Sequence, residues 1–122
     1  MKTCFDHEKL DAYKNAIAFA AWSEAILERV PKSSVLYGQL DRAPTSIVLN
    51  IPEGNGRFTP ADRCKFFDIA RGSGLESAGC LDLPFIKSSV SDAGLNEGKS
   101  LLKGCRLTPG RAHPQYLTRP IA

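Results

Sequence analysis

The stretch from Ser46 to Glu76 constrains the fold of this chain most strongly, because it joins two helix patterns through a short turn. Apolar residues precede the turn at spacings of three and four, which place them on one face of a helix. These residues are Leu36, Leu40, Ala43, Ile47 and Ile51. The helix should end near Gly54 or Gly56, since glycine accepts the left-handed conformation of a helix C-cap.

A second helix begins directly after this turn. Thr59 can cap it, Pro60 suits its first position, and Asp62 can reach back like the acid of a capping box. We therefore predict a tight connection between two antiparallel helices. Pro44 and Pro52 interrupt the first of them, and an internal proline removes a backbone hydrogen bond and tends to kink a helix.

Three further segments complete an all-α pattern. The stretch from His7 to Val30 lacks Gly and Pro and carries one apolar face, with Asp6 as its expected N-cap. The helix beginning at Pro60 should continue to about Pro84, and another should follow a cap at Ser89 or Ser91. No useful length of the chain alternates as a strand does. The prediction is an antiparallel up-and-down four-helix bundle over residues 1–103, followed by an irregular basic tail over 104–122.

Length and charge narrow the class of protein. A chain of 122 residues suits one domain, and its longest apolar run, Ala16–Trp22, is far too short to span a bilayer. The first residues are charged, so we expect no signal peptide. The four cysteines show no CxxC spacing, which argues against a zinc site. We therefore expect a cytoplasmic protein with reduced thiols. Five basic residues and no acids follow Glu97, which could attract an anionic partner, although such tails also serve solubility alone.

Residues of about 5 to 102 resemble the four-helix-bundle family of 23S rRNA intervening-sequence proteins. The resemblance is carried by the segments Phe5–Leu10, Gln39–Ala43, Ser46–Ile47, Asn50–Ile51, Glu53–Arg57, Phe66–Phe67, Ile69–Ser73 and Glu76. It implies a ring of five subunits and no enzyme activity. A related branch, the accessory proteins of diversity-generating retroelements, binds nucleic acid together with a reverse transcriptase. In the family the last helix continues beyond position 104, whereas here its apolar stripe stops.

Polar residues around the central turn have two interpretations. Arg42, Asn50, Glu53, Arg57, Ser73 and Glu76 are predicted to form a structural polar cluster that sets helix register. Two glutamates in a bundle core could instead hold metals, but that chemistry needs Glu-x-x-His motifs, which the chain lacks. We predict no catalytic residues, no metal and no cofactor.

A weaker pattern suggests an anion site. Arg57 leads directly to the helix start at Thr59, whose free amides could hold one phosphate. The candidate phosphate-contacting residues are Arg57, Arg63, Lys65 and Arg71. Arg63 and Lys65 lie two positions apart and cannot share a helix face. A solvated, charged helix surface is the competing interpretation.

Two functions remain open from the sequence. One is a non-enzymatic homo-oligomer that binds RNA or DNA through backbone phosphates. The other is an oligomeric adaptor that recruits another protein and binds no nucleic acid. Charge separates them: residues 1–97 carry a net charge of −2, which argues against strong nucleic-acid binding unless the fold segregates the charge.

Overall fold

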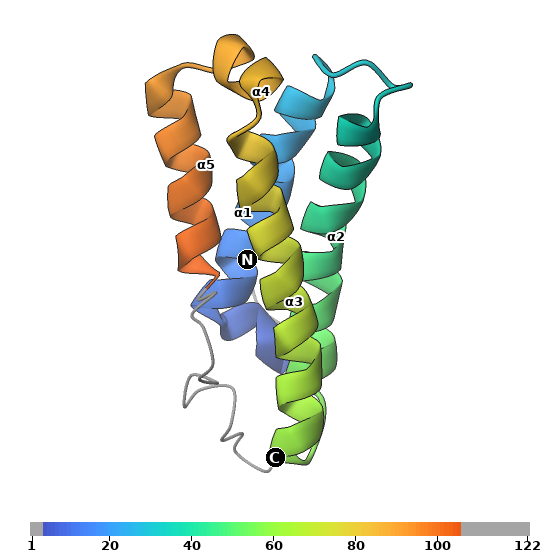
Figure 1. The fold of residues 1–122 in the computed structure, drawn as a ribbon. Coiled ribbons are helices and arrows are strands. Elements are labelled where there is room, and N and C mark those ends of the chain that lie inside the picture. Colours follow the sequence, from blue (N-terminus) through green and yellow to red (C-terminus); the bar gives the residue numbers. More distant parts are fainter. Residues whose placement is uncertain (1–3, 106–122) are drawn as a thin grey trace.

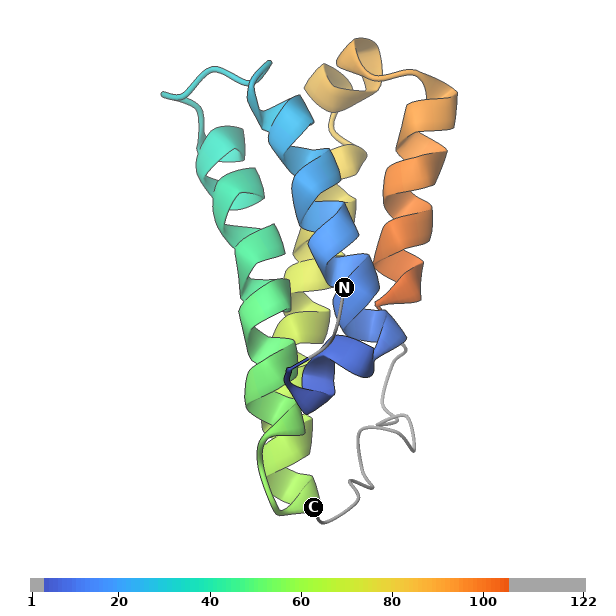
Figure 2. The ribbon, with the colours of Figure 1, turned by 180° about the vertical axis from the view of Figure 1, so that it is seen from behind.

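The computed structural model describes residues 4–105, and these form helices only. A short 3-10 helix, η1 (Asp6–Lys9), precedes α1 (Asp11–Leu27), α2 (Val35–Asn55), α3 (Pro60–Leu81), the short α4 (Pro84–Ser89) and α5 (Asp92–Gly104). The four long helices lie side by side, with α4 at one end between α3 and α5 (Figures 1 and 2). The predicted all-α class is confirmed. The predicted tail lies outside the described residues from position 106 onward.

Hydroxyl side chains begin three of the long helices. The Thr59 hydroxyl accepts a hydrogen bond from the Asp62 amide at 3.2 Å, and Pro60 occupies the first position of α3, as predicted. The Ser91 hydroxyl caps α5 in the same way, and Ser34 caps α2. Each hydroxyl pairs with one of the amides that a helix start leaves without an intrahelical partner.

The predicted first helix is wrong in one respect. Asp6 does not cap a single helix from His7 but begins η1, and the chain becomes extended at Leu10 before α1 starts. No side chain caps α1. The apolar pattern continues across this break because Leu10 and Tyr13 both pack against the core, so periodicity alone could not reveal it.

Both internal prolines lie within α2, which continues through them to Asn55. Pro44 is buried, and the neighbouring positions Ala43 and Ile47 belong to the core. Packing of α2 against α1 and, most extensively, against α3 outweighs the lost backbone hydrogen bonds. The prolines therefore mark the interior of the helix and do not mark its boundary.

The core lies between the helices and is built from small and branched side chains around Phe19, Leu40, Ile47, Leu81 and Ile86. Trp22 packs between α1 and α5, where a Cβ added to Gly98 would stand 2.5 Å from its ring. The Trp22 ring on α1 therefore packs against the backbone of α5 at Gly98. Among the described residues, no helix combines the length and hydropathy needed to span a membrane.

Candidate functional site

The residues singled out by the sequence meet where α2 ends and α3 begins. Gly54 lies within the last turn of α2, and Gly56 follows as its C-cap with φ −80°, so neither supplies the left-handed cap that the sequence predicts. Gly54 is needed for a different reason. A Cβ there would stand 2.7 Å from the Phe67 ring and 3.1 Å from the Arg63 carbonyl oxygen. Its missing side chain lets α2 and α3 approach closely.

Arg63 is the largest fully buried side chain among the described residues, with 1% of its surface exposed. Its Nη1 donates to the carbonyl oxygen of Asn55 at 2.9 Å and to that of Arg57 at 3.3 Å. The guanidinium also lies 5.9 Å from the centre of the Phe67 ring. A cation is favoured at the C-terminus of α2, where the backbone carbonyls carry partial negative charge. Arg63 therefore fastens the turn from inside.

This burial corrects one predicted site residue. Arg63 does not belong to an exposed basic surface and is not positioned to contact a phosphate in solvent. The helical spacing explains the difference, since Arg63 occupies the inward face of α3 while Lys65 is exposed. The sequence signal was this spacing, because Arg63 precedes the buried Phe67 by four residues and the buried Ala70 by seven.

A second contact fixes η1 to the same turn. The Asn55 amide donates to the Asp6 carboxylate at 3.0 Å, and Asn55 is itself buried. Asn55 therefore links η1 to α3, because its side chain donates to Asp6 while its backbone carbonyl accepts a hydrogen bond from Arg63. The sequence suggested no structural role for Asn55 and suggested a role as helix N-cap for Asp6. Their link joins segments 49 residues apart, which no local pattern could have shown.

The predicted polar cluster is spread along the α2–α3 interface. The Arg42 Nη2 atom on α2 lies 3.8 Å from the Glu76 Oε1 atom on α3. At the C-terminal end of α2, the Arg57 Nη2 atom lies 3.0 Å from the Glu53 Oε2 atom. Between these two pairs, the Ser73 hydroxyl bonds to the Ser46 hydroxyl at 2.7 Å.

Asn50 joins the same strip, because its amide donates to both oxygens of Ser46, backbone and hydroxyl. Ser46 was not assigned to the cluster, although it stands in the segment that carried the family resemblance. Arg42 is 71% exposed and its pair with Glu76 contributes little to stability. The partly buried Ser46, Asn50 and Ser73 are better placed to set the register of the two helices.

The exposed cations gather around Phe66. The Arg57 guanidinium lies 4.5 Å from the ring centre and the Lys65 ammonium 5.9 Å from it. Arg71 is half-buried, and its Nε has no hydrogen-bond partner. Only Arg57 and Lys65, of the four candidates, share one surface in this way. Phe58, which follows Arg57, is 91% exposed.

Within residues 4–105, no three His, Cys, Asp or Glu side chains gather as a metal site requires. The four cysteines are free thiols. Burial raises the pKa of Cys105 to about 12. Burial, with a smaller effect of the Glu76 charge, also raises the pKa of Cys80. Both therefore stay protonated at neutral pH, and a protonated thiol is a poor nucleophile.

We expect an aromatic disulfide reagent to distinguish the four cysteines in the native protein near pH 8. Cys4 is exposed and should react first, followed by the half-buried Cys64. Cys80 and Cys105 should react only after urea unfolds the chain. Mass spectrometry of the labelled peptides gives the order. Rapid labelling of Cys105 in the folded protein would contradict the packing described here.

A family comparison connects this geometry to known proteins. The sequence model of the 23S rRNA-intervening sequence proteins matches residues 8–106, which span every long helix. The chain belongs to the 23S rRNA-intervening sequence protein family. Neither the curated proteins nor the solved structures contain a match to it. The segments that carry the resemblance coincide with the contacts at the α2–α3 turn, including Asp6, Asn55 and Gly54.

Proposed function

We propose that this protein is a non-enzymatic, cytoplasmic homo-oligomer that acts through its helical surfaces as an adaptor. The observation that carries the proposal is the solvent face of α2. Val35 is 79% exposed and Leu49 is 60% exposed on this helix. The family resemblance supports a ring of five copies.

Shallow hollows on both sides of Leu49 support the same proposal. One is lined by Pro52, Glu53 and Arg57, and the other by Arg42 and Thr45, and Leu49 contributes to both. An apolar side chain flanked by charged groups of both signs resembles the core and rim of a protein interface. A second copy could bury Leu49 there and pair its own charges with those of the rim.

The antiparallel up-and-down order of the bundle belongs to this proposal as well. Contacts between α2 and α3 join higher residue numbers in α2 to lower residue numbers in α3. The examples are Arg42–Glu76, Ser46–Ser73 and Gly54–Phe67. This pattern supports opposite directions for α2 and α3, and a bundle of this kind presents α2 along one whole side.

Replacing Leu49 by glutamate should dissociate the oligomer. Light scattering after size exclusion is expected to give a multiple of 13.3 kDa for the wild type and the monomer mass for Leu49→Glu. A buried charge at the centre of an interface costs far more than the same charge in water. Glu28→Gln, at the exposed C-cap of α1, changes one charge and serves as the control. A wild-type monomer at all accessible concentrations would refute the proposal.

Binding of RNA or DNA is the second candidate. Arg57 and Lys65 beside Phe66 favour it, because cations and an aromatic ring together suit a nucleic-acid backbone and its bases. The oligomer would repeat this small surface on each copy. Glu53 neutralises part of the Arg57 charge, which limits the affinity that one copy can supply.

Fluorescence anisotropy with mixed RNA and DNA oligonucleotides tests this second candidate. We expect weak binding, insensitive to sequence, whose affinity falls as salt rises through release of counterions. Lys65→Ala should reduce the slope of that salt dependence by about one unit per copy engaged. Lys87→Ala, on α4 at the opposite end of the bundle, should leave it unchanged (Figure 1). If no binding is seen at low salt, nucleic-acid binding is refuted and only the adaptor role stands.

A further inference from the structure

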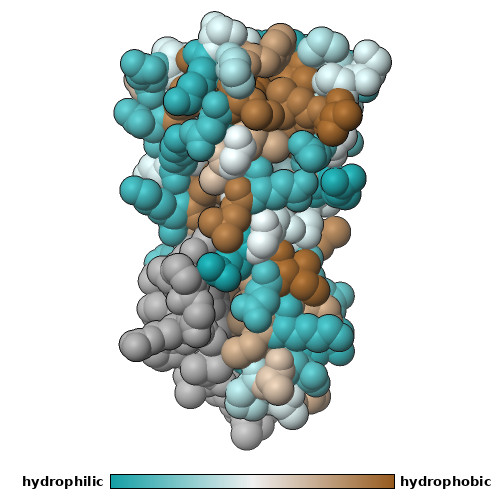
Figure 3. Space-filling view, in the orientation of Figure 1, coloured by the Kyte–Doolittle hydropathy of each residue, from teal (hydrophilic) through white to brown (hydrophobic). Residues whose placement is uncertain are grey.

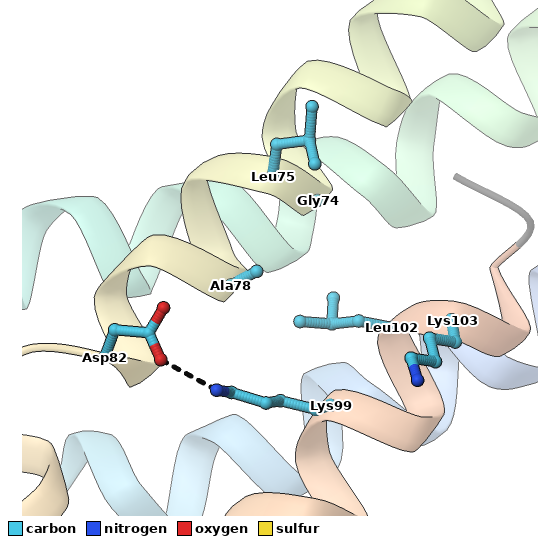
Figure 4. A pocket seen from close by; sticks show the side chains of 7 residues that line it. All are labelled: Gly74, Leu75, Ala78, Asp82, Lys99, Leu102 and Lys103. Atoms are coloured by element: carbon cyan, nitrogen blue, oxygen red, sulfur yellow. Dashed lines mark hydrogen bonds and ion pairs between the residues drawn. The ribbon is translucent and has the colours of Figure 1, made fainter. Parts of the chain in front are cut away.

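An apolar groove of about 370 Å³ runs between α3 and α5 (Figure 4). Its floor is formed by Gly74, Ala78 and Leu102, while Leu75 stands at one side. Figure 3 shows apolar residues on the surface between α5 and α3. The groove stays open because α3 and α5 contact one another little, and because glycine and alanine leave the floor low.

The two ends of the groove differ. At one end Lys99 reaches across to Asp82, with 2.7 Å between Nζ and Oδ1. At the other end α5 stops at Gly104, whereas α3 and α2 extend further (Figures 1 and 2). The groove is therefore bridged by an ion pair near α4 and is open where the chain leaves α5. Lys103, two residues before the last described residue, lines this open end.

We propose that residues 106–122 of the same chain occupy this groove. The segment begins beside the open end, since Cys105 immediately precedes it. Its 17 residues reach roughly 56 Å when extended. The part of α3 that lines the groove, from Gly74 to Asp82, measures only about 12 Å along the helix axis. The segment can therefore place a side chain at any point of the floor.

The covalent connection favours this occupant over a free partner. A short tether holds a segment at an effective concentration on the order of millimolar, so that even a weak contact is populated. Three prolines, at 109, 114 and 120, restrict the segment before it docks and reduce the entropy lost on docking. Tyr116 and Leu117 are its adjacent large apolar side chains. They supply the anchor, with the tyrosine hydroxyl left at the polar rim.

Charge predicts how this docking responds to salt. The segment carries three arginines and no acid, and the rim of the groove carries Lys99 and Lys103 with one carboxylate, Asp82. Asp82 is already paired with Lys99. The hydrogen bond from Lys99, together with the lysine charge, lowers the pKa of the Asp82 carboxyl. Attraction between charges does not drive the contact. Apolar burial drives it, and occupancy should be insensitive to salt.

Nuclear magnetic resonance of the full chain tests the proposal. The double variant Tyr116→Ser, Leu117→Ser should shift the backbone amide signals of Gly74, Ala78 and Leu102, while the rest of the spectrum stays in place. The matched control replaces the flanking polar residues, Gln115→Ser and Thr118→Ser, and should shift none of them. A peptide of sequence 106–122 added to the double variant should restore the wild-type positions at concentrations on the order of millimolar.

Three outcomes would overturn this proposal. Identical spectra for the double variant and the wild type would show that the segment does not fill the groove. Shifts that depend on protein concentration would assign the groove to a second copy of the chain. Restoration that weakens steeply with added salt would assign it to a charged partner on Lys99 and Lys103. The substitutions lie outside the described residues, and circular dichroism should show the same helix content in all three proteins.

Discussion

Replacing Arg63 by alanine is expected to lower the free energy of unfolding by about 3 kcal/mol, as measured by urea denaturation. The change removes the largest fully buried side chain and leaves a cavity between α2 and α3. It also takes the donor away from the carbonyl oxygens of Asn55 and Arg57 at the end of α2. Buried acceptors that lose their donor are costly, because water cannot reach them in compensation.

Two further variants separate the causes. Arg63→Met fills most of the cavity but donates no hydrogen bond, so its cost should fall to about 1–2 kcal/mol. Lys65→Ala, two positions along the same helix, removes an exposed cation and should change stability by less than about 0.5 kcal/mol. If Arg63→Ala unfolds at the same urea concentration as Lys65→Ala, Arg63 does not fasten the turn.

Replacing Gly54 by alanine should destabilise the protein by about 2 kcal/mol, even though alanine is the better helix former. The new methyl group would stand 2.7 Å from the Phe67 ring and 3.1 Å from the backbone carbonyl of Arg63. The ring is packed in the core and the carbonyl belongs to a helix, so neither can retreat cheaply. Steric overlap outweighs the gain in helix propensity of about 1 kcal/mol.

Gly72 provides the matched control on α3. A Cβ there meets nothing within 4 Å, so Gly72→Ala should stabilise the protein by up to about 1 kcal/mol. Thermal unfolding of both variants under the same conditions gives changes of opposite sign. A Gly54→Ala protein as stable as Gly72→Ala would mean that α2 and α3 do not approach one another as closely as described.

The same glycines show what the sequence could predict. Helical spacing identified four long helices, and the Thr59–Pro60 start of α3 was placed to the residue. In α3, Gly72 and Gly79 face open space, so close packing does not require a glycine at either position. The close approach lies at Gly54, in the other helix of the pair. Spacing reports which face of a helix is apolar, and it does not report how near a neighbouring helix comes.

Predictions about polar residues were correct where the contact is local and wrong where it depends on long-range packing. Glu53 lies in the last turn of α2 and Arg57 follows four residues later, just past the helix end, so their pairing follows from local geometry. The burial of Arg63 and the bond between Asp6 and Asn55 depend on how distant segments pack. The short α4 was missed because Pro84 ends one helical pattern and begins another within six residues. Proline is equally compatible with a helix end and with a first helical position.

The position of Arg63 has a consequence for the order in which the chain folds. Its bond to Asn55 spans eight residues, and only residues 56–59 connect α2 to α3. Closing so short a loop costs little entropy, whereas the contact of Arg29 with Ser89 must close 60 residues. We expect the α2–α3 pair to form early and to serve as the surface on which α1 docks. Placing α5 against α1 is then the last and slowest step of assembly within one chain.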